Sequence, residues 1–95
     1  ALVTANAIPD PQPLRLPTHV NGTLMQNATT ADMLFPVATL ISYISQYLTL
    51  EPGDVLATGT PAGIGAFRKP PQWLGAGDRI EVAIEPIGTL VTTVA

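Results

Sequence analysis

The clearest periodic pattern in the chain is a run of apolar residues, at spacings of three and four, between Phe35 and Leu48. This spacing places apolar side chains on one face of an α-helix. Pro36 is compatible with a helix only in its first turn, and Asp32 is a candidate N-terminal cap. The pattern therefore predicts one amphipathic helix, whose apolar face comprises Val37, Leu40, Ile41, Ile44, Tyr47 and Leu48.

Strict alternation marks two strands near the C-terminus. From Arg79 to Glu85 the apolar residues Ile80, Val82 and Ile84 occupy every second position. This alternation is typical of a half-buried strand. Pro86-Ile87-Gly88 forms a turn, and the segment from Thr89 to Val94 is predicted to return as the partner strand.

A second hairpin is predicted from Leu14 to Gln26. Asn21-Gly22 is a strong hairpin signal, because both positions of such a turn favour a positive φ. Pro17 cannot donate a backbone hydrogen bond, so it favours a place at the edge of a sheet for the first strand. The preceding segment, residues 1–13, is rich in proline and reads as a surface connection.

Between the helix and the C-terminal hairpin, Val55-Leu56-Ala57 is a short apolar run predicted to be a buried strand. With strands at both ends of the chain and one helix between them, the predicted fold class is α+β. Ninety-five residues amount to one domain or less.

The composition indicates that part of the chain's apolar surface is covered by a partner. Apolar residues make up 46% of the chain and charged residues only 12%, against roughly 25% charged residues in ordinary globular domains. A second copy of the chain, or a further part of the same polypeptide, could cover the extra apolar surface. The latter is the favoured interpretation.

Charge and residue usage exclude several classes of function. The net charge is −3, and the four basic residues are too scattered for a nucleic-acid surface. There is no cysteine, hence neither a disulfide framework nor a thiolate metal site, which fits a cytoplasmic protein. No apolar run is long enough for a membrane span.

The usual catalytic groups are sparse. His19 is the only histidine, and its position in a strand favours a structural role over catalysis. Glu81 and Glu85 alternate with apolar residues, as on a solvated strand face. None of the seven acids forms a close pair near His19, so a metal site within this chain alone is not expected.

The remaining candidate is the loop from Thr58 to Gly65. Its glycines allow close approach of a ligand to the backbone, and Thr58 and Thr60 add hydroxyl groups. Small residues, hydroxyls and free amides suit a carboxylate or an enolate oxygen. A tight structural turn accounts for the same composition equally well.

At this loop the sequence resembles a known family. The stretch from Leu50 to Gly65, LEPGDVLATGTPAGIG, is similar to the C-terminal signature of the fumarylacetoacetate hydrolase family. The similarity continues into the flanks and covers essentially the whole chain. Its main flanking segments are Ile8-Pro9-Asp10-Pro11, Val20-Asn21-Gly22, Ile41 to Ser45, Gly77-Asp78 and Ile87 to Leu90.

This resemblance implies a part of the family's mixed β-sandwich roll. It also implies an enzyme that binds Mg²⁺ or Mn²⁺ and hydrolyses, decarboxylates or isomerises small 2-oxo or β-diketo acids, as in aromatic or amino-acid catabolism. The wording of the motif is most similar to the isomerases of 2-hydroxyhepta-2,4-diene-1,7-dioate and to the acylpyruvate hydrolases. Thr60 corresponds to the family's substrate contact, Gly59 and Thr58 shape the loop, and Gln26 is a neighbour with a structural role.

The resemblance implies no catalytic residue or metal ligand in this chain. The family's Glu-x-Glu pair, later Asp and catalytic Lys all correspond to positions before Ala1. Residues 1–95 are therefore expected to be the C-terminal portion of a catalytic domain, inactive when isolated, and completed by the N-terminal portion or a homodimer partner. The alternative is a non-catalytic dimerisation or binding module with the same fold.

Overall fold

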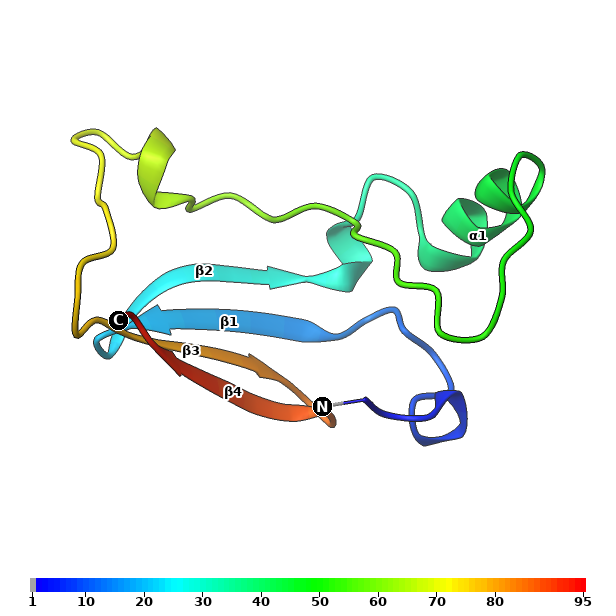
Figure 1. Ribbon diagram of the computed structural model, residues 1–95, viewed down its shortest axis with the longest axis horizontal. Coiled ribbons are helices and arrows are strands. Elements are labelled where there is room, and N and C mark those ends of the chain that lie inside the picture. Colours follow the sequence, from blue (N-terminus) through cyan, green and yellow to red (C-terminus); the bar gives the residue numbers. More distant parts are fainter. Residues whose placement is uncertain (1) are drawn as a thin grey trace.

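A four-stranded antiparallel sheet forms the centre of the computed structural model, which describes residues 2–95 (Figure 1). The strand order is β2-β1-β3-β4. Two sequence-local hairpins, β1–β2 and β3–β4, are joined through the pairing of β1 with β3. The strands are β1 Arg15–Val20, β2 Thr23–Thr29, β3 Arg79–Ile84 and β4 Gly88–Thr93. Both predicted hairpins are confirmed.

The turn of the first hairpin explains why Asn21-Gly22 is needed there. Asn21 has a φ of 51° and Gly22 a φ of 81°, and asparagine and glycine tolerate this left-handed region best. Asn21 also reaches the start of β3. Its side-chain amide donates to Asp78 Oδ1 at 2.9 Å, and its Oδ1 accepts from the backbone N–H of Arg79 at 2.9 Å.

The prediction that Pro17 favours an edge position for its strand is wrong. β1 lies inside the sheet, paired with both β2 and β3. The pairing of β1 with β3 involves only Thr18 to Val20. Pro17 therefore lies just beyond this ladder, where its missing N–H costs no hydrogen bond to β3.

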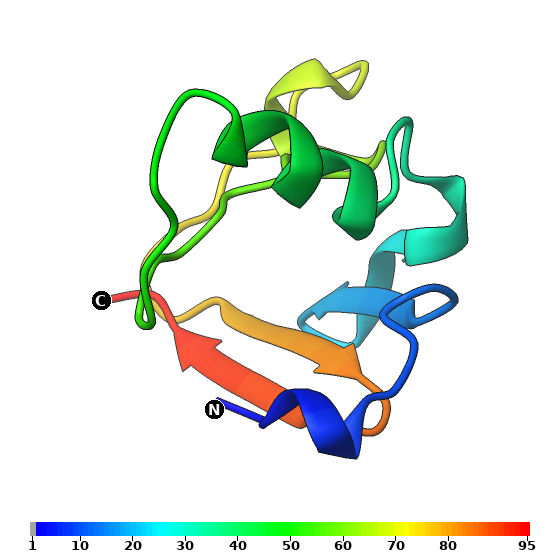
Figure 2. The same cartoon turned by 90° about the vertical axis from the view of Figure 1, so that its right-hand side faces the viewer.

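The pleat gives the sheet an apolar face and a polar face. The register places Leu16 and Val20 of β1 on the same face as Ile80, Val82 and Ile84 of β3. Gln26 of β2 lies opposite Thr18, so it belongs to this face as well. Figure 2 shows helix α1, Val37–Ser45, and much of the segment between β2 and β3 on one side of the sheet.

The helix α1 spans Val37–Ser45 and is shorter than the predicted helix, which extended to Leu48. Asp32 does not cap it but lies in the short 3-10 helix Thr30–Asp32, and residues 2–95 contain two further 3-10 turns, Ala5–Ala7 and Gly65–Phe67. The backbone N–H of Val37 instead donates to Gln12 Oε1 at 3.1 Å. The cap therefore comes from the segment before β1. No helix within residues 2–95 has the length and apolar character needed to cross a bilayer.

The strand predicted at Val55-Leu56-Ala57 is not formed, and these residues are exposed. A strand requires a neighbouring strand that supplies its ladder of hydrogen bonds. Val55 to Ala57 pair with none of the four strands. The apolar run itself does not distinguish a paired strand from an unpaired extended segment.

One helix and a four-stranded antiparallel sheet confirm the α+β class. The arrangement is open rather than compact. The radius of gyration is 15.4 Å, whereas a compact chain of this length has about 12 Å. No side chain of residues 2–95 is buried, and large apolar side chains such as Val55, Phe67 and Trp73 are mostly exposed.

Candidate functional site

The candidate loop, from Thr58 to Gly65, is attached to strand β2 by side-chain hydrogen bonds. Gln26 Nε2 donates to Thr60 Oγ1 at 3.0 Å and to the carbonyl oxygen of Pro61 at 2.9 Å. Gln26 is held in β2 by the pairing of that strand with β1. The Thr60 hydroxyl is therefore fixed to the rigid part of the fold although Thr60 itself is exposed.

Arg68 makes a second attachment. Its Nη2 donates to the carbonyl oxygen of Met25 at 2.6 Å, and its Nε donates to the carbonyl oxygen of Gly63 at 3.2 Å. A guanidinium group has several N–H donors in a fixed plane, so it can hold two carbonyl groups at once. Arg68 thereby links the loop, at Gly63, to β2, at Met25, which directly precedes Gln26.

Gly63 and Gly65 lie at positions where the neighbouring backbone leaves no space for a side chain. A Cβ atom on Gly63 would overlap the carbonyl oxygen of Met25, and Gly63 has a φ of 109°. A Cβ atom on Gly65 would overlap the carbonyl oxygen of Gln72. These contacts leave room for glycine alone, so two of the loop's glycines serve close backbone packing.

The three predicted site residues differ in their surroundings. Thr60 makes the hydrogen bond to Gln26 described above. Gly59 has a φ of 92° but open space around it, so it is required for the backbone path. Thr58 makes no side-chain hydrogen bond within residues 2–95 and is exposed. The loop therefore presents its hydroxyl and amide groups to the outside, where they are available to an oxygen anion.

The described residues offer no metal site. Residues 2–95 contain no group of three or more His, Cys, Asp or Glu side chains that could hold an ion. A divalent cation requires several such oxygen or nitrogen ligands. The donor set of this chain does not fit a catalytic metal, and no chemical step through a metal is assigned to its residues.

His19 and Glu81 lie on the face of the sheet opposite Gln26, and therefore away from the loop. Glu81 forms an ion pair with Arg79 at 2.5 Å on β3, and His19 lies opposite Glu81 in the register of β1 and β3. The pKa of Asp78 is held below its ordinary value of 3.8, chiefly by the backbone N–H of Gly75 and also by the Asn21 side chain. Asp78 stabilises the junction between the β1–β2 turn and β3.

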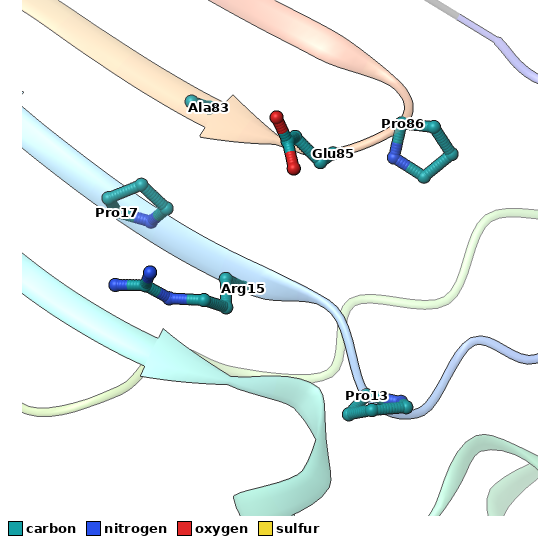
Figure 3. Close-up of a pocket in the computed structure, with 6 residues that line it drawn as sticks. All are labelled: Pro13, Arg15, Pro17, Ala83, Glu85 and Pro86. Carbon is teal, nitrogen blue, oxygen red and sulfur yellow. The ribbon is translucent and has the colours of Figure 1, made fainter.

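A surface pocket also lies away from the loop (Figure 3). Its lining residues lie at the start of β1 and at the turn that follows β3, and Arg15 and Glu85 are its charged members. By the register of the sheet the Arg15 side chain lies on the face opposite Gln26. Pro13, Pro17, Ala83 and Pro86 complete the lining. The pocket contains no residue of the candidate loop.

Sequence reasoning identified the loop but not all of its attachments. The family resemblance implies a structural role for Gln26, whereas no pattern in the sequence points to Arg68. Its role depends on contacts with Met25, 43 residues earlier in the chain. The sequence near Arg68 contains no local signal for such a contact.

Comparison with known proteins identifies the class to which this fold and loop belong. All 95 residues match the family described as fumarylacetoacetate hydrolase, C-terminal. The chain belongs to the fumarylacetoacetate hydrolase family. The resemblance read from the sequence is confirmed.

The relatives are enzymes with different named reactions. The mitochondrial oxaloacetate tautomerase of Bos taurus is 46% identical over 94 residues, which cover 99% of this chain and 30% of the relative. The 2-hydroxyhepta-2,4-diene-1,7-dioate isomerase of Mycobacterium marinum has a TM-score of 0.77 and 43% identity, covering 90% of this chain and 31% of that structure.

A third relative was solved with bound ligands. The maleylpyruvate hydrolase of Sphingobium, in complex with manganese(II) and pyruvate, has a TM-score of 0.86 and 37% identity. The match covers 99% of this chain and 33% of that structure. The present chain thus spans about a third or less of the length of these three relatives.

Proposed function

We propose that these 95 residues form the substrate-carboxylate part of an enzyme acting on small 2-oxo acids. The observation that carries this proposal is the Thr60 hydroxyl, held by Gln26 on an exposed loop that Arg68 and Gly63 attach to β2. A preorganised hydroxyl flanked by free backbone amides suits a carboxylate or an enolate oxygen. The named relatives act on acids of this kind, and one was solved with pyruvate.

The reaction class is a hydrolysis or an isomerisation, including tautomerisation, as in the named relatives. A divalent cation, Mg²⁺ or Mn²⁺, would stabilise enolate character in the substrate. Its ligands would have to come from residues other than those described, since residues 2–95 provide no suitable group. In this chain the task of Thr60, Gly59 and Thr58 is to bind and orient the substrate.

The proposal is tested in the intact enzyme, meaning the full-length protein that contains these residues. Thr60→Val removes the hydroxyl but keeps the shape of the side chain. A hydrogen bond to a charged group is worth roughly 1.5–3 kcal/mol, so kcat/KM for an acylpyruvate or oxaloacetate should fall about 10- to 150-fold.

Thr60→Ser is the matched control, because it retains the hydroxyl and should keep most of the activity. Equal unfolding midpoints for the two variants would exclude a general loss of structure. Unchanged kinetics in Thr60→Val would contradict a substrate role for this hydroxyl.

A non-catalytic binding or dimerisation module is the second candidate, and the large exposed apolar surface favours it. The two candidates differ in one simple respect. The enzyme requires a Glu-x-Glu pair, a later Asp and a Lys in the same gene or in a partner chain, whereas the binding module does not.

The cytoplasmic location stays a prediction, and the Bos taurus relative is named mitochondrial.

A further inference from the structure

The contacts of Gln26 fix the direction of the hydrogen bond that it shares with Thr60. The two ends of a glutamine amide differ, because Nε2 has two N–H donors and Oε1 only accepts. The carbonyl oxygen of Pro61 can only accept, so the end that faces it must be Nε2. The same Nε2 lies 3.0 Å from Thr60 Oγ1, so its second N–H donates to the hydroxyl oxygen.

This direction determines what the Thr60 hydroxyl can do next. A threonine hydroxyl has one hydrogen to donate and can accept through its lone pairs. Since Oγ1 accepts from Gln26, its own hydrogen remains for another partner. Thr60 makes no other side-chain hydrogen bond within residues 2–95, and it is exposed. The partner that best completes this arrangement is an oxygen acceptor.

We propose that Gln26 is a positioning residue that makes the Thr60 hydroxyl a hydrogen-bond donor toward the substrate, and so favours ligands with an anionic oxygen at this point. The inference rests on the proposed function and deepens it, because it assigns the chemical character of the group bound at Thr60. A carboxylate or an enolate oxygen accepts such a bond strongly, whereas a cationic nitrogen has no lone pair to offer.

Arg68 supports the same arrangement from the other side of the loop. By holding the carbonyl groups of Met25 and Gly63, it keeps the loop at a fixed distance from β2. Gln26 follows Met25 directly, so Nε2 stays within reach of both Thr60 and Pro61. The arrangement thus has one residue that sets the direction of the bond and one that holds the loop in place.

The test is a double-mutant cycle in the intact, metal-loaded enzyme, with pyruvate as the probe. Gln26→Met keeps the length of the side chain and removes both donors. The dissociation constant of pyruvate is measured for the wild type, Q26M, T60V and the double variant. If Gln26 acts through the hydroxyl, Q26M should weaken binding about fivefold in the wild-type background and less than twofold in the T60V background.

A purely structural role for Gln26 predicts a different result. The hydrogen bond to Pro61 is present in both backgrounds, so its loss would weaken pyruvate binding equally in both. That equal loss would overturn the inference while leaving the proposed function intact. Absence of pyruvate binding and of 2-oxo acid turnover by the wild type would overturn both.

Two further variants keep the test interpretable. Gln46→Met, near the exposed end of α1, is the control for a glutamine-to-methionine change and should bind pyruvate like the wild type. If Q26M fails to fold, Gln26→Glu replaces it, since glutamate keeps the size of the side chain. Its carboxylate would accept a hydrogen bond from the Thr60 hydroxyl, so Q26E should weaken binding more than tenfold with Thr60 present and less in the T60V background. Equal weakening in both backgrounds would contradict the inference.

Discussion

Gly63 illustrates how a single hydrogen atom in place of a side chain shapes the candidate site. Its positive φ and its approach to the Met25 carbonyl are both incompatible with a Cβ atom. We expect Gly63→Ala to destabilise the intact enzyme by roughly 1–3 kcal/mol, because the backbone must move away from a strained conformation. Denaturant unfolding measures this change, and the affinity for pyruvate should fall with it.

Gly75→Ala is the matched control for this prediction. A Cβ atom on Gly75 would meet no atom within 4 Å, and its φ lies outside the left-handed region. Its stability should therefore stay close to that of the wild type. Equal losses in the two alanine variants would contradict the role assigned to the Gly63 contact.

Asp78 predicts a specific dependence of stability on pH. Hydrogen bonds from Gly75 and Asn21 lower the pKa of its carboxyl group below 3.8 in the folded state. Because this pKa is lower in the folded than in the unfolded protein, the ionised carboxylate stabilises the fold fully at pH values above the unfolded pKa. This stabilisation is lost as the pH falls through the folded pKa. Wild type should therefore be more stable than Asp78→Asn near neutral pH, with the difference shrinking below pH 3.8.

The measurement is the free energy of unfolding of both proteins from neutral to acidic pH. Glu85→Gln serves as the control, because no hydrogen bond from residues 2–95 reaches the Glu85 carboxylate. A difference between wild type and Asp78→Asn that stays constant over the whole pH range would rule out the carboxylate as its source.

Among the secondary-structure elements, helix α1 is capped at its N-terminus by a residue far from it in the chain. Gln12 accepts a hydrogen bond from the Val37 N–H, and its Nε2 donates to the carbonyl oxygen of Thr30 at 2.6 Å. Loss of a helix cap costs about 0.5–2 kcal/mol. We expect Gln12→Met to lower stability by this amount, measured by denaturant unfolding of the intact enzyme. Gln72→Met, whose side chain makes no hydrogen bond within residues 2–95, should change it little.

The same contact explains which elements the sequence could predict. The hairpins were predictable because alternation and the Asn21-Gly22 turn are local signals. The cap of α1 was not, since Gln12 lies 25 residues before Val37. The strand expected at Val55 to Ala57 failed for a related reason, because pairing depends on a distant partner.

In the candidate site, too, local features could be predicted from the sequence and long-range contacts could not. The composition of the loop from Thr58 to Gly65 suggested an oxygen-binding role and can be read from neighbouring residues. Its attachment to β2 through Arg68 and Gln26 connects residues 34 to 43 positions apart. Such contacts are properties of the folded chain and leave no periodic pattern in the sequence.

For the molecule as a whole, the exposed surface is the most informative quantity. The accessible area is 7388 Å², whereas a compact monomer of this mass exposes about 5,200 Å². The excess of roughly 2,200 Å² is comparable to the area of an obligate interface. Its apolar part includes Leu34, Val55, Phe67 and Trp73, which are 88%, 91%, 82% and 75% exposed.

This surface predicts the behaviour of the isolated 95-residue chain. Without buried side chains the favourable term for cooperative folding is small. We expect a broad thermal transition, binding of a hydrophobic dye, and no turnover of acylpyruvates with Mg²⁺ present. A sharp calorimetric transition or metal-dependent turnover by the purified 95-residue chain would contradict this expectation.

The junction between Asn21 and the start of β3 has a consequence for the order of folding. Asn21 and Arg79 are 58 residues apart, and their contact joins the two hairpins into one sheet. Closing so long a segment costs about 2 kcal/mol more in chain entropy than closing a hairpin. Each hairpin can form within microseconds on its own, whereas the pairing of β1 with β3 must wait for a rare encounter. The middle of the sheet is thus expected to form last, and the speed of that step depends on how compactly residues 30–78 collapse beforehand.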